Sequence, residues 1–127
     1  MSRQIIQTVN APQAIGTYSQ AVRVGSTVYI SGQIPLDPQT GILITDDINL
    51  EIRRVFDNLA AIAMAAGSSL SQSVRVTIYL LDMTHFSKVN DIMADYFPKP
   101  WPARAAVAVA ELPRGARIEI DCILHLE

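Results

Sequence analysis

The sequence predicts an α+β fold in which one mixed or antiparallel sheet carries two helices on a single face. Three observations support this class. Apolar residues alternate with polar ones near both ends and in the middle of the chain, which is typical of half-buried strands. Two other segments repeat apolar residues at three- and four-residue spacing, as amphipathic helices do, and clusters of Pro and Gly separate the elements. The expected order is β-β-β-α-β-α-β-β.

The N-terminal third contains three expected strands. A short apolar run at 5–9 reads as an edge strand, and an ordered loop follows it. Runs 21–24 and 27–31 are rich in β-formers and flank a Gly-Ser pair, which favours a hairpin because glycine tolerates positive φ. Segment 33–41 holds two prolines and a glycine, so we expect a turn-rich connection there.

The middle of the chain predicts helix, strand and helix. Apolar residues recur at helical spacing from Ile48 to Ala66, with two aspartates just before this segment and Gly67 just after it, which are start and stop signals. Segment 74–80 alternates apolar and polar residues and predicts a strand. A second helix is expected over about 84–96, where three closely spaced prolines then follow.

The last two strands, 104–110 and 116–126, are expected to form a closing hairpin. In the second strand an apolar stripe that includes Cys122 should face the helices. The other face would carry alanines beside Arg104 and Glu119, as a cleft wall or a subunit interface would. In such a hairpin Arg104 would lie across from about Ile123, roughly 13 Å from Glu119 at 3.3 Å per residue. The two need not meet within one chain.

Composition narrows the possible functions. The 127 residues, half of them hydrophobic, suffice for one domain over 1–127. A net charge of −2 without a basic cluster disfavours nucleic acid as a partner. No apolar run reaches the roughly 18 residues of a membrane span, and a lone cysteine fits a reducing compartment, which suggests a cytoplasmic protein. The charged fraction of 17% is low, so some apolar surface is expected to meet another subunit.

Few residues predict chemistry by themselves. Arg104 suits a carboxylate ligand because its fork donates two parallel hydrogen bonds, although a structural ion pair is the more common role of such an arginine. Glu119 could orient a water molecule or be satisfied at an interface. Gly32 ends a strand and could offer its amide to a ligand or merely form a turn. The two histidines lie in no metal-ligand pattern, so we expect no metal site.

Three motifs give a specific resemblance that extends over nearly the whole chain. They are Ile15-Gly16-Thr17-Tyr18-Ser19-Gln20-Ala21, Ser31-Gly32-Gln33-Ile34-Pro35, and Pro102-Ala103-Arg104-Ala105-Ala106 with its continuation to Asp121. The chain resembles the RidA (YjgF) family. The resemblance implies a chorismate-mutase-like subunit, a homotrimeric barrel with clefts between subunits, and deamination of 2-iminobutanoate or 2-iminopropanoate released by pyridoxal-phosphate enzymes. It implies that no cofactor is needed.

The resemblance also assigns site residues by position. Arg104 matches the arginine that holds the substrate carboxylate, and Glu119 matches the acidic residue at the reactive end of the substrate. Four further residues match cleft positions: Tyr18, Ser31, Gly32 and Asn90. Ala106 also lies at a substrate-binding position, where many deaminases of the family have cysteine, so a role for a thiol in catalysis or regulation is not expected in this chain.

Two rival functions and one variant of the deaminase hypothesis remain open. Several members of the family are described as endoribonucleases or translation inhibitors, a function that the net charge and the lack of a basic patch disfavour. A noncatalytic trimer could bind small carboxylates through Arg104 without turnover. An enzyme of the same kind could act on aminoacrylate-like intermediates instead of the two imines above.

Overall fold

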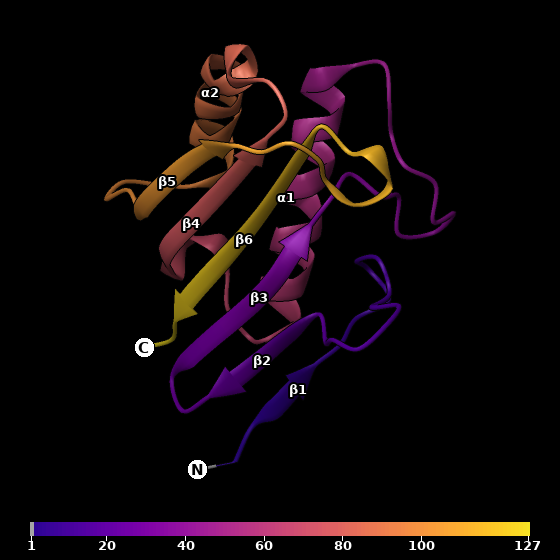
Figure 1. Ribbon diagram of the computed structural model, residues 1–127. Coiled ribbons are helices and arrows are strands. Elements are labelled where there is room, and N and C mark those ends of the chain that lie inside the picture. Colours follow the sequence, from indigo (N-terminus) through magenta and orange to yellow (C-terminus); the bar gives the residue numbers. More distant parts are fainter. Residues whose placement is uncertain (1) are drawn as a thin grey trace.

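The computed structural model describes residues 2–127 as one six-stranded sheet with two helices behind it (Figure 1). The strand order is β1-β2-β3-β6-β4-β5, and every neighbouring pair is antiparallel except β4 and β5. The elements are β1 Gln4–Ile6, β2 Ala21–Val24, β3 Thr27–Gln33, α1 Ile48–Ala65, β4 Ser73–Leu80, α2 Phe86–Tyr96, β5 Ala103–Ala108 and β6 Ile118–His125. This mixed sheet with two helices on one face confirms the predicted fold class and element order.

The predicted closing hairpin is wrong. The chain crosses over after β5, and β6 enters the middle of the sheet between β3 and β4. β5 pairs instead with β4, in parallel, with Arg104 beside Val76 rather than Ile123. The physical reason is burial: four alternating residues of β6 are at most 1% exposed, whereas β5 presents mostly small, exposed side chains. The most apolar strand takes the centre, and the alanine-rich strand takes an edge.

The core lies between the sheet and the helices. Asp47 caps α1, its carboxylate accepting hydrogen bonds from the amides of Asn49 and Leu50 at 3.0 and 3.2 Å, which satisfies amides that have no partner inside the helix. The helix then buries one face against β6 and β3. Fully buried side chains of both layers meet there: Ile52, Val55, Phe56, Leu59, Ile62, Val28, Val76, Ile78, Leu80, Ile118, Ile120 and Leu124.

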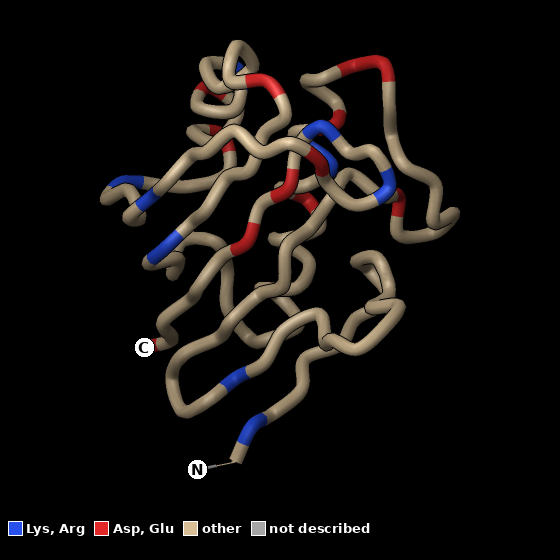
Figure 2. The backbone as a smooth tube through the Cα atoms, viewed as in Figure 1, with Lys and Arg blue, Asp and Glu red and all other residues tan. Residues whose placement is uncertain are grey.

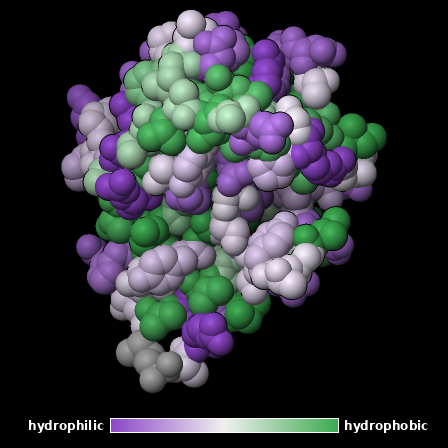
Figure 3. Space-filling view, viewed as in Figure 1, coloured by the Kyte–Doolittle hydropathy of each residue, from purple (hydrophilic) through white to green (hydrophobic). Residues whose placement is uncertain are grey.

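The opposite face of the sheet is not covered by either helix and carries several exposed apolar side chains. One row crosses all six strands, through Ile5, Val22, Tyr29, Ile123, Arg75 and Ala103. Ile5 is 56% exposed and Tyr29 51%. Figure 3, which views this face, shows apolar patches interrupted by polar atoms over the strands. Large exposed apolar side chains on one face are typical of an interaction surface.

Neither helix of the described residues is long and apolar enough to cross a membrane.

Candidate functional site

Arg104 lies on the free edge strand and points toward the helices. It pairs with Val76, which is fully buried under the helices, and paired residues of neighbouring strands project to the same face of a sheet. Its Nη1 donates a 2.8 Å hydrogen bond to Oδ1 of Asn90 on α2 and contacts the Met93 sulfur at 3.8 Å. The structure therefore brings Arg104 and Asn90, two of the predicted site residues, into contact.

An aromatic ring also fixes the guanidinium of Arg104. Its Cζ lies 4.8 Å from the ring centroid of Phe86, within the range of a cation–π interaction. Phe86, Asn90 and Met93 are spaced by four and three residues, so one face of α2 supplies all three contacts. Because these contacts engage Nη1 and the plane of the guanidinium, its other nitrogens can donate to a ligand.

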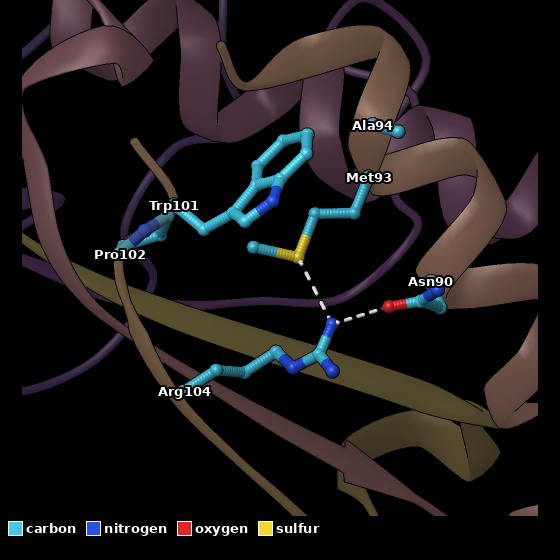
Figure 4. A pocket seen from close by; sticks show the side chains of 6 residues that line it. All are labelled: Asn90, Met93, Ala94, Trp101, Pro102 and Arg104. Atoms are coloured by element: carbon cyan, nitrogen blue, oxygen red, sulfur yellow. Dashed lines mark hydrogen bonds between the residues drawn. The ribbon is translucent and has the colours of Figure 1, made fainter. Parts of the chain in front are cut away.

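Beside this guanidinium is a cavity of ≈ 350 Å³ (Figure 4). Its lining combines one cation and one amide with apolar groups: Asn90, Met93, Ala94, Trp101, Pro102 and Arg104. Trp101 and Met93 both extend into it in Figure 4. Trp101 is 52% exposed, an unusual state for the largest apolar side chain in the protein. The arrangement suits an anion that carries an apolar group.

Glu119 lies on the other face of the sheet, at the centre. It pairs with Tyr79 of β4 and is half-buried. Burial raises the pKa of the Glu119 carboxyl above its usual range, and the charge of Asp121 raises it further. Asp121 is itself held by the Tyr79 hydroxyl, which donates to its Oδ2 at 3.1 Å. A carboxyl with a raised pKa can exchange a proton with a bound water at a pH closer to neutrality.

Gly32 packs directly against the Glu119 side chain. The register between β3 and β6 shifts between Ile30 and Gln33, so an extra residue of β3 forms a bulge at Ser31 and Gly32. A Cβ added to Gly32 would lie 2.8 Å from Cδ of Glu119, closer than real Cβ contacts. The missing side chain of Gly32 is thus what leaves room for the carboxylate.

The N-terminal loop brings Tyr18 and Ser31 to the same side of the molecule. The Ser31 hydroxyl donates to the Ser19 carbonyl oxygen at 2.5 Å, and the Ser31 amide donates to the Gln20 carbonyl oxygen at 2.9 Å. The buried Gln20 amide nitrogen donates to the carbonyl oxygens of Thr8 and Pro12, at 2.9 and 2.8 Å. Tyr18, held by this loop, remains 53% exposed.

The structure therefore divides the predicted site residues into two groups. Arg104 and Asn90 lie at the edge on the helix side, whereas Glu119, Ser31 and Gly32 lie together on the uncovered side. The expectation that Arg104 and the alanines in line with it, such as Ala106, share a face with Glu119 is wrong, because β5 turns Arg104 toward α2. Ala106 shares the face of Arg104 and packs partly buried against the core.

The thiol of Cys122 does not belong to either group of candidate site residues. Cys122 is buried in the packing stripe, as predicted, and burial raises the pKa of its thiol to about 11, so it is not a nucleophile at neutral pH. Among residues 2–127, no three His, Cys, Asp or Glu side chains lie close enough to hold a metal ion.

Sequence reasoning missed four residues that shape the site. Phe86 and Met93 hold the guanidinium, Trp101 walls the cavity, and Gln20 fixes the loop that carries Tyr18. The signal for the first two was present, since they and Asn90 lie on one stripe of the predicted second helix. Trp101 could have been noticed as an aromatic residue between prolines, three positions before Arg104.

The fold and these side chains define a small α+β protein with an arginine-lined cavity at a sheet edge and a carboxylate on the uncovered face. The family profile described as Endoribonuclease L-PSP matches residues 8–126, and the chain belongs to that family, which includes the RidA proteins that the sequence resembles. A mouse protein named 2-iminobutanoate/2-iminopropanoate deaminase is 48% identical over 121 residues, 95% of this chain and 90% of the mouse protein.

Two crystal structures resemble the chain throughout. RidA from the Antarctic bacterium Psychrobacter superposes with a TM-score of 0.93 at 47% identity and covers 97% of this chain and 99% of its own. TdcF from E. coli, solved with bound serine, superposes with a TM-score of 0.91 at 37% identity over 98% and 99% of the two chains. The serine in TdcF is a small molecule with a carboxylate, the chemistry for which an arginine fork is suited.

Proposed function

We propose that the protein hydrolyses 2-iminobutanoate, 2-iminopropanoate and related imines to 2-oxo acids and ammonia. The observation that carries this proposal is the oriented guanidinium of Arg104, fixed by Asn90 and Phe86 at the cavity, in a chain nearly half identical to a named deaminase. A 2-imino acid has a carboxylate next to its reactive carbon. A fixed guanidinium can hold that carboxylate and thereby position the carbon.

Hydrolysis needs little beyond a positioned water and a proton carrier. The water oxygen adds to C2 of the imine while the nitrogen takes up a proton, and Glu119 accepts the proton that the water loses. In the resulting carbinolamine Glu119 returns its proton to the amine nitrogen, and the hydroxyl releases a proton to solvent in place of the one that the imine nitrogen took up. The C–N bond then breaks, leaving ammonia and the 2-oxo acid. Nothing in these steps is oxidised or reduced, so the proposal includes neither a metal nor an organic cofactor.

The proposed active site lies between subunits of a homotrimer. Within one chain Arg104 and Glu119 lie on opposite faces of the sheet, so a substrate that touches both must lie between two copies. The uncovered face with Tyr29 and Ile5 would close the trimer, and the exposed Tyr18 and the Ser31–Gly32 bulge would complete the cleft on the side of Glu119. The match to the family that includes the RidA proteins supports a homotrimer, which the resemblance to RidA proteins implies. The buried thiol of Cys122 fits a cytoplasmic location.

A coupled assay tests the reaction. A threonine or serine dehydratase would generate the imine in situ, and 2-oxo acid formation would be followed with wild-type protein, with Arg104→Ala and with no addition. We expect acceleration by the wild type and loss of nearly all of it in Arg104→Ala, because the carboxylate loses its fork. Wild-type turnover in that variant would refute the assignment.

Mixing inactive variants tests the shared cleft. Arg104→Ala and Glu119→Gln would be unfolded and refolded together, so that some clefts receive Arg104 from one chain and Glu119 from the other. In a cyclic trimer with random assembly, about one quarter of the clefts would regain both residues. We expect activity to recover to about that fraction, whereas each variant refolded alone stays inactive. No recovery in mixed trimers would place the site within one chain.

The endoribonuclease function finds no specific support in the geometry. Lys and Arg are distributed over separate elements, with acidic residues on both helices and on β6 (Figure 2). Binding along a phosphate backbone requires a continuous basic stripe, and the Lys and Arg residues of the described chain do not form one in this view.

A further inference from the structure

We infer that the cavity between Trp101 and α2 binds the side chain of the substrate, and that this protein is built for 2-imino acids with large apolar side chains, such as those of leucine or phenylalanine. This inference rests on the proposed deaminase function and adds a specificity-determining residue, Trp101, to it. The cavity adjoins the guanidinium of Arg104, so an imino acid held there by its carboxylate has its own side chain within reach of the cavity.

The size of the cavity exceeds what a small imine needs. A water molecule occupies about 30 Å³ of liquid, and a methyl or ethyl group is of similar size, so such a substrate would leave most of the ≈ 350 Å³ filled with water. A branched or aromatic side chain would displace that water from apolar walls, which is favourable in proportion to the apolar surface that it covers.

The chemistry of the lining favours the same class of ligand. Trp101 offers a broad flat surface, and the Met93 thioether adapts to irregular shapes and interacts well with aromatic rings. Pro102 and Ala94 complete the apolar wall, and Asn90 already accepts a hydrogen bond from Arg104. A charged substrate side chain would find no oppositely charged partner among the lining residues apart from Arg104 itself.

The test compares large and small imines on the intact protein. An amino-acid oxidase would release the imines of leucine, phenylalanine and alanine, and kcat/KM would be measured for wild type, Trp101→Ala and Ala94→Leu. Ala94→Leu fills the cavity from the exposed side of α2, and leucine is a good helix former. This variant should therefore fold even if Trp101→Ala does not. We expect either change to lower the large-to-small ratio of kcat/KM by about ten-fold or more.

A matched control and a binding measurement separate the possible failures. Leu50→Ala removes a similarly exposed apolar side chain, on α1 and outside the cavity, and should leave the ratio as it is. Binding of 4-methyl-2-oxopentanoate, compared with pyruvate, would be read from the rise in Tm. An unchanged ratio, or equal losses for both substrates, overturns the cavity assignment while the deaminase function stands. Absence of turnover of every imine overturns the function, and stronger stabilisation by the larger oxo acid, lost in Ala94→Leu, would still support the cavity.

Discussion

Gly32→Ala tests whether the site depends on the close contact between Gly32 and Glu119. The φ angle of Gly32 is outside the left-handed region, so the backbone at this position can accommodate alanine. The new Cβ, however, would lie 2.8 Å from Cδ and 3.1 Å from Cγ of Glu119. Carbon atoms prefer about 3.5–4.0 Å, so the carboxylate must retreat by about 1 Å. A catalytic group misplaced by about 1 Å can cost about 100-fold in rate.

The same change should alter stability only slightly. Alanine restricts the unfolded chain and gains about 0.4–1 kcal/mol, whereas displacing Glu119 costs about 1–3 kcal/mol, because the clash involves the movable end of a side chain. We therefore expect the free energy of unfolding to fall by at most about 2.6 kcal/mol, which is about 3 minus about 0.4, while imine hydrolysis falls by about 100-fold. Urea unfolding and the coupled assay measure the two effects on one preparation.

A double variant shows whether the contact itself causes the loss. Once Glu119→Ala has removed the obstructing carboxylate, adding Gly32→Ala should no longer destabilise the protein and should stabilise it by about 0.4–1 kcal/mol. The reasoning is refuted if Gly32→Ala keeps hydrolysis within about two-fold of wild type. It is refuted equally if the two substitutions contribute additively to the free energy of unfolding.

Three further predictions concern groups buried in the fold. Asn58→Ala should lower the free energy of unfolding by about 1–3 kcal/mol in urea titration, because the Asn58 amide is fully buried and donates to the carbonyl oxygens of Leu36 and Ile34. Cys122 should react with an alkylating reagent at pH 8 only on unfolding, since burial raises its pKa to about 11; rapid labelling of the native protein would contradict this. Glu119→Gln should abolish hydrolysis. It should also raise the urea midpoint of unfolding, relative to wild type, more at pH 7 than at pH 4. The pKa of Glu119 is raised in the folded protein, so ionisation of this carboxyl destabilises the wild type as the pH rises above its unfolded pKa.

The local pattern of the sequence predicted the elements well, because periodicity reports how each residue faces its own surroundings. The alternation in 116–126 predicted which side of β6 is buried, and the start and stop signals bracketed α1 within two residues. The local pattern could not predict the strand order. Alternation does not indicate which strands pair with each other, and the short turn at Pro113 suggested a hairpin of β5 and β6 that the central position of β6 excludes.

The orientation of Arg104 was unpredictable for a related reason. Apolarity alone would bury Val107 and Val109 and expose Arg104, whereas the structure turns Arg104 toward α2 and leaves Val107 43% exposed on the other face. This is possible because β5 lies at the edge, where a long side chain can cover apolar surface with its stem and keep its charged end in contact with Asn90. On an edge strand a charged side chain can therefore face the helices, whereas the residues of a central strand that face the helices are apolar.

The positions of the two candidate groups agree with what each must do. A guanidinium stays charged in any surroundings, so Arg104 can sit on an exposed edge strand, where a second subunit can bring the other half of the cleft. Glu119 needs a pKa near the working pH to take a proton from water, and the centre of the sheet provides the burial that raises it. That burial makes the ionised form costly to the fold. A carboxyl that served stability alone would be better placed in solvent, which favours a functional reason for its position.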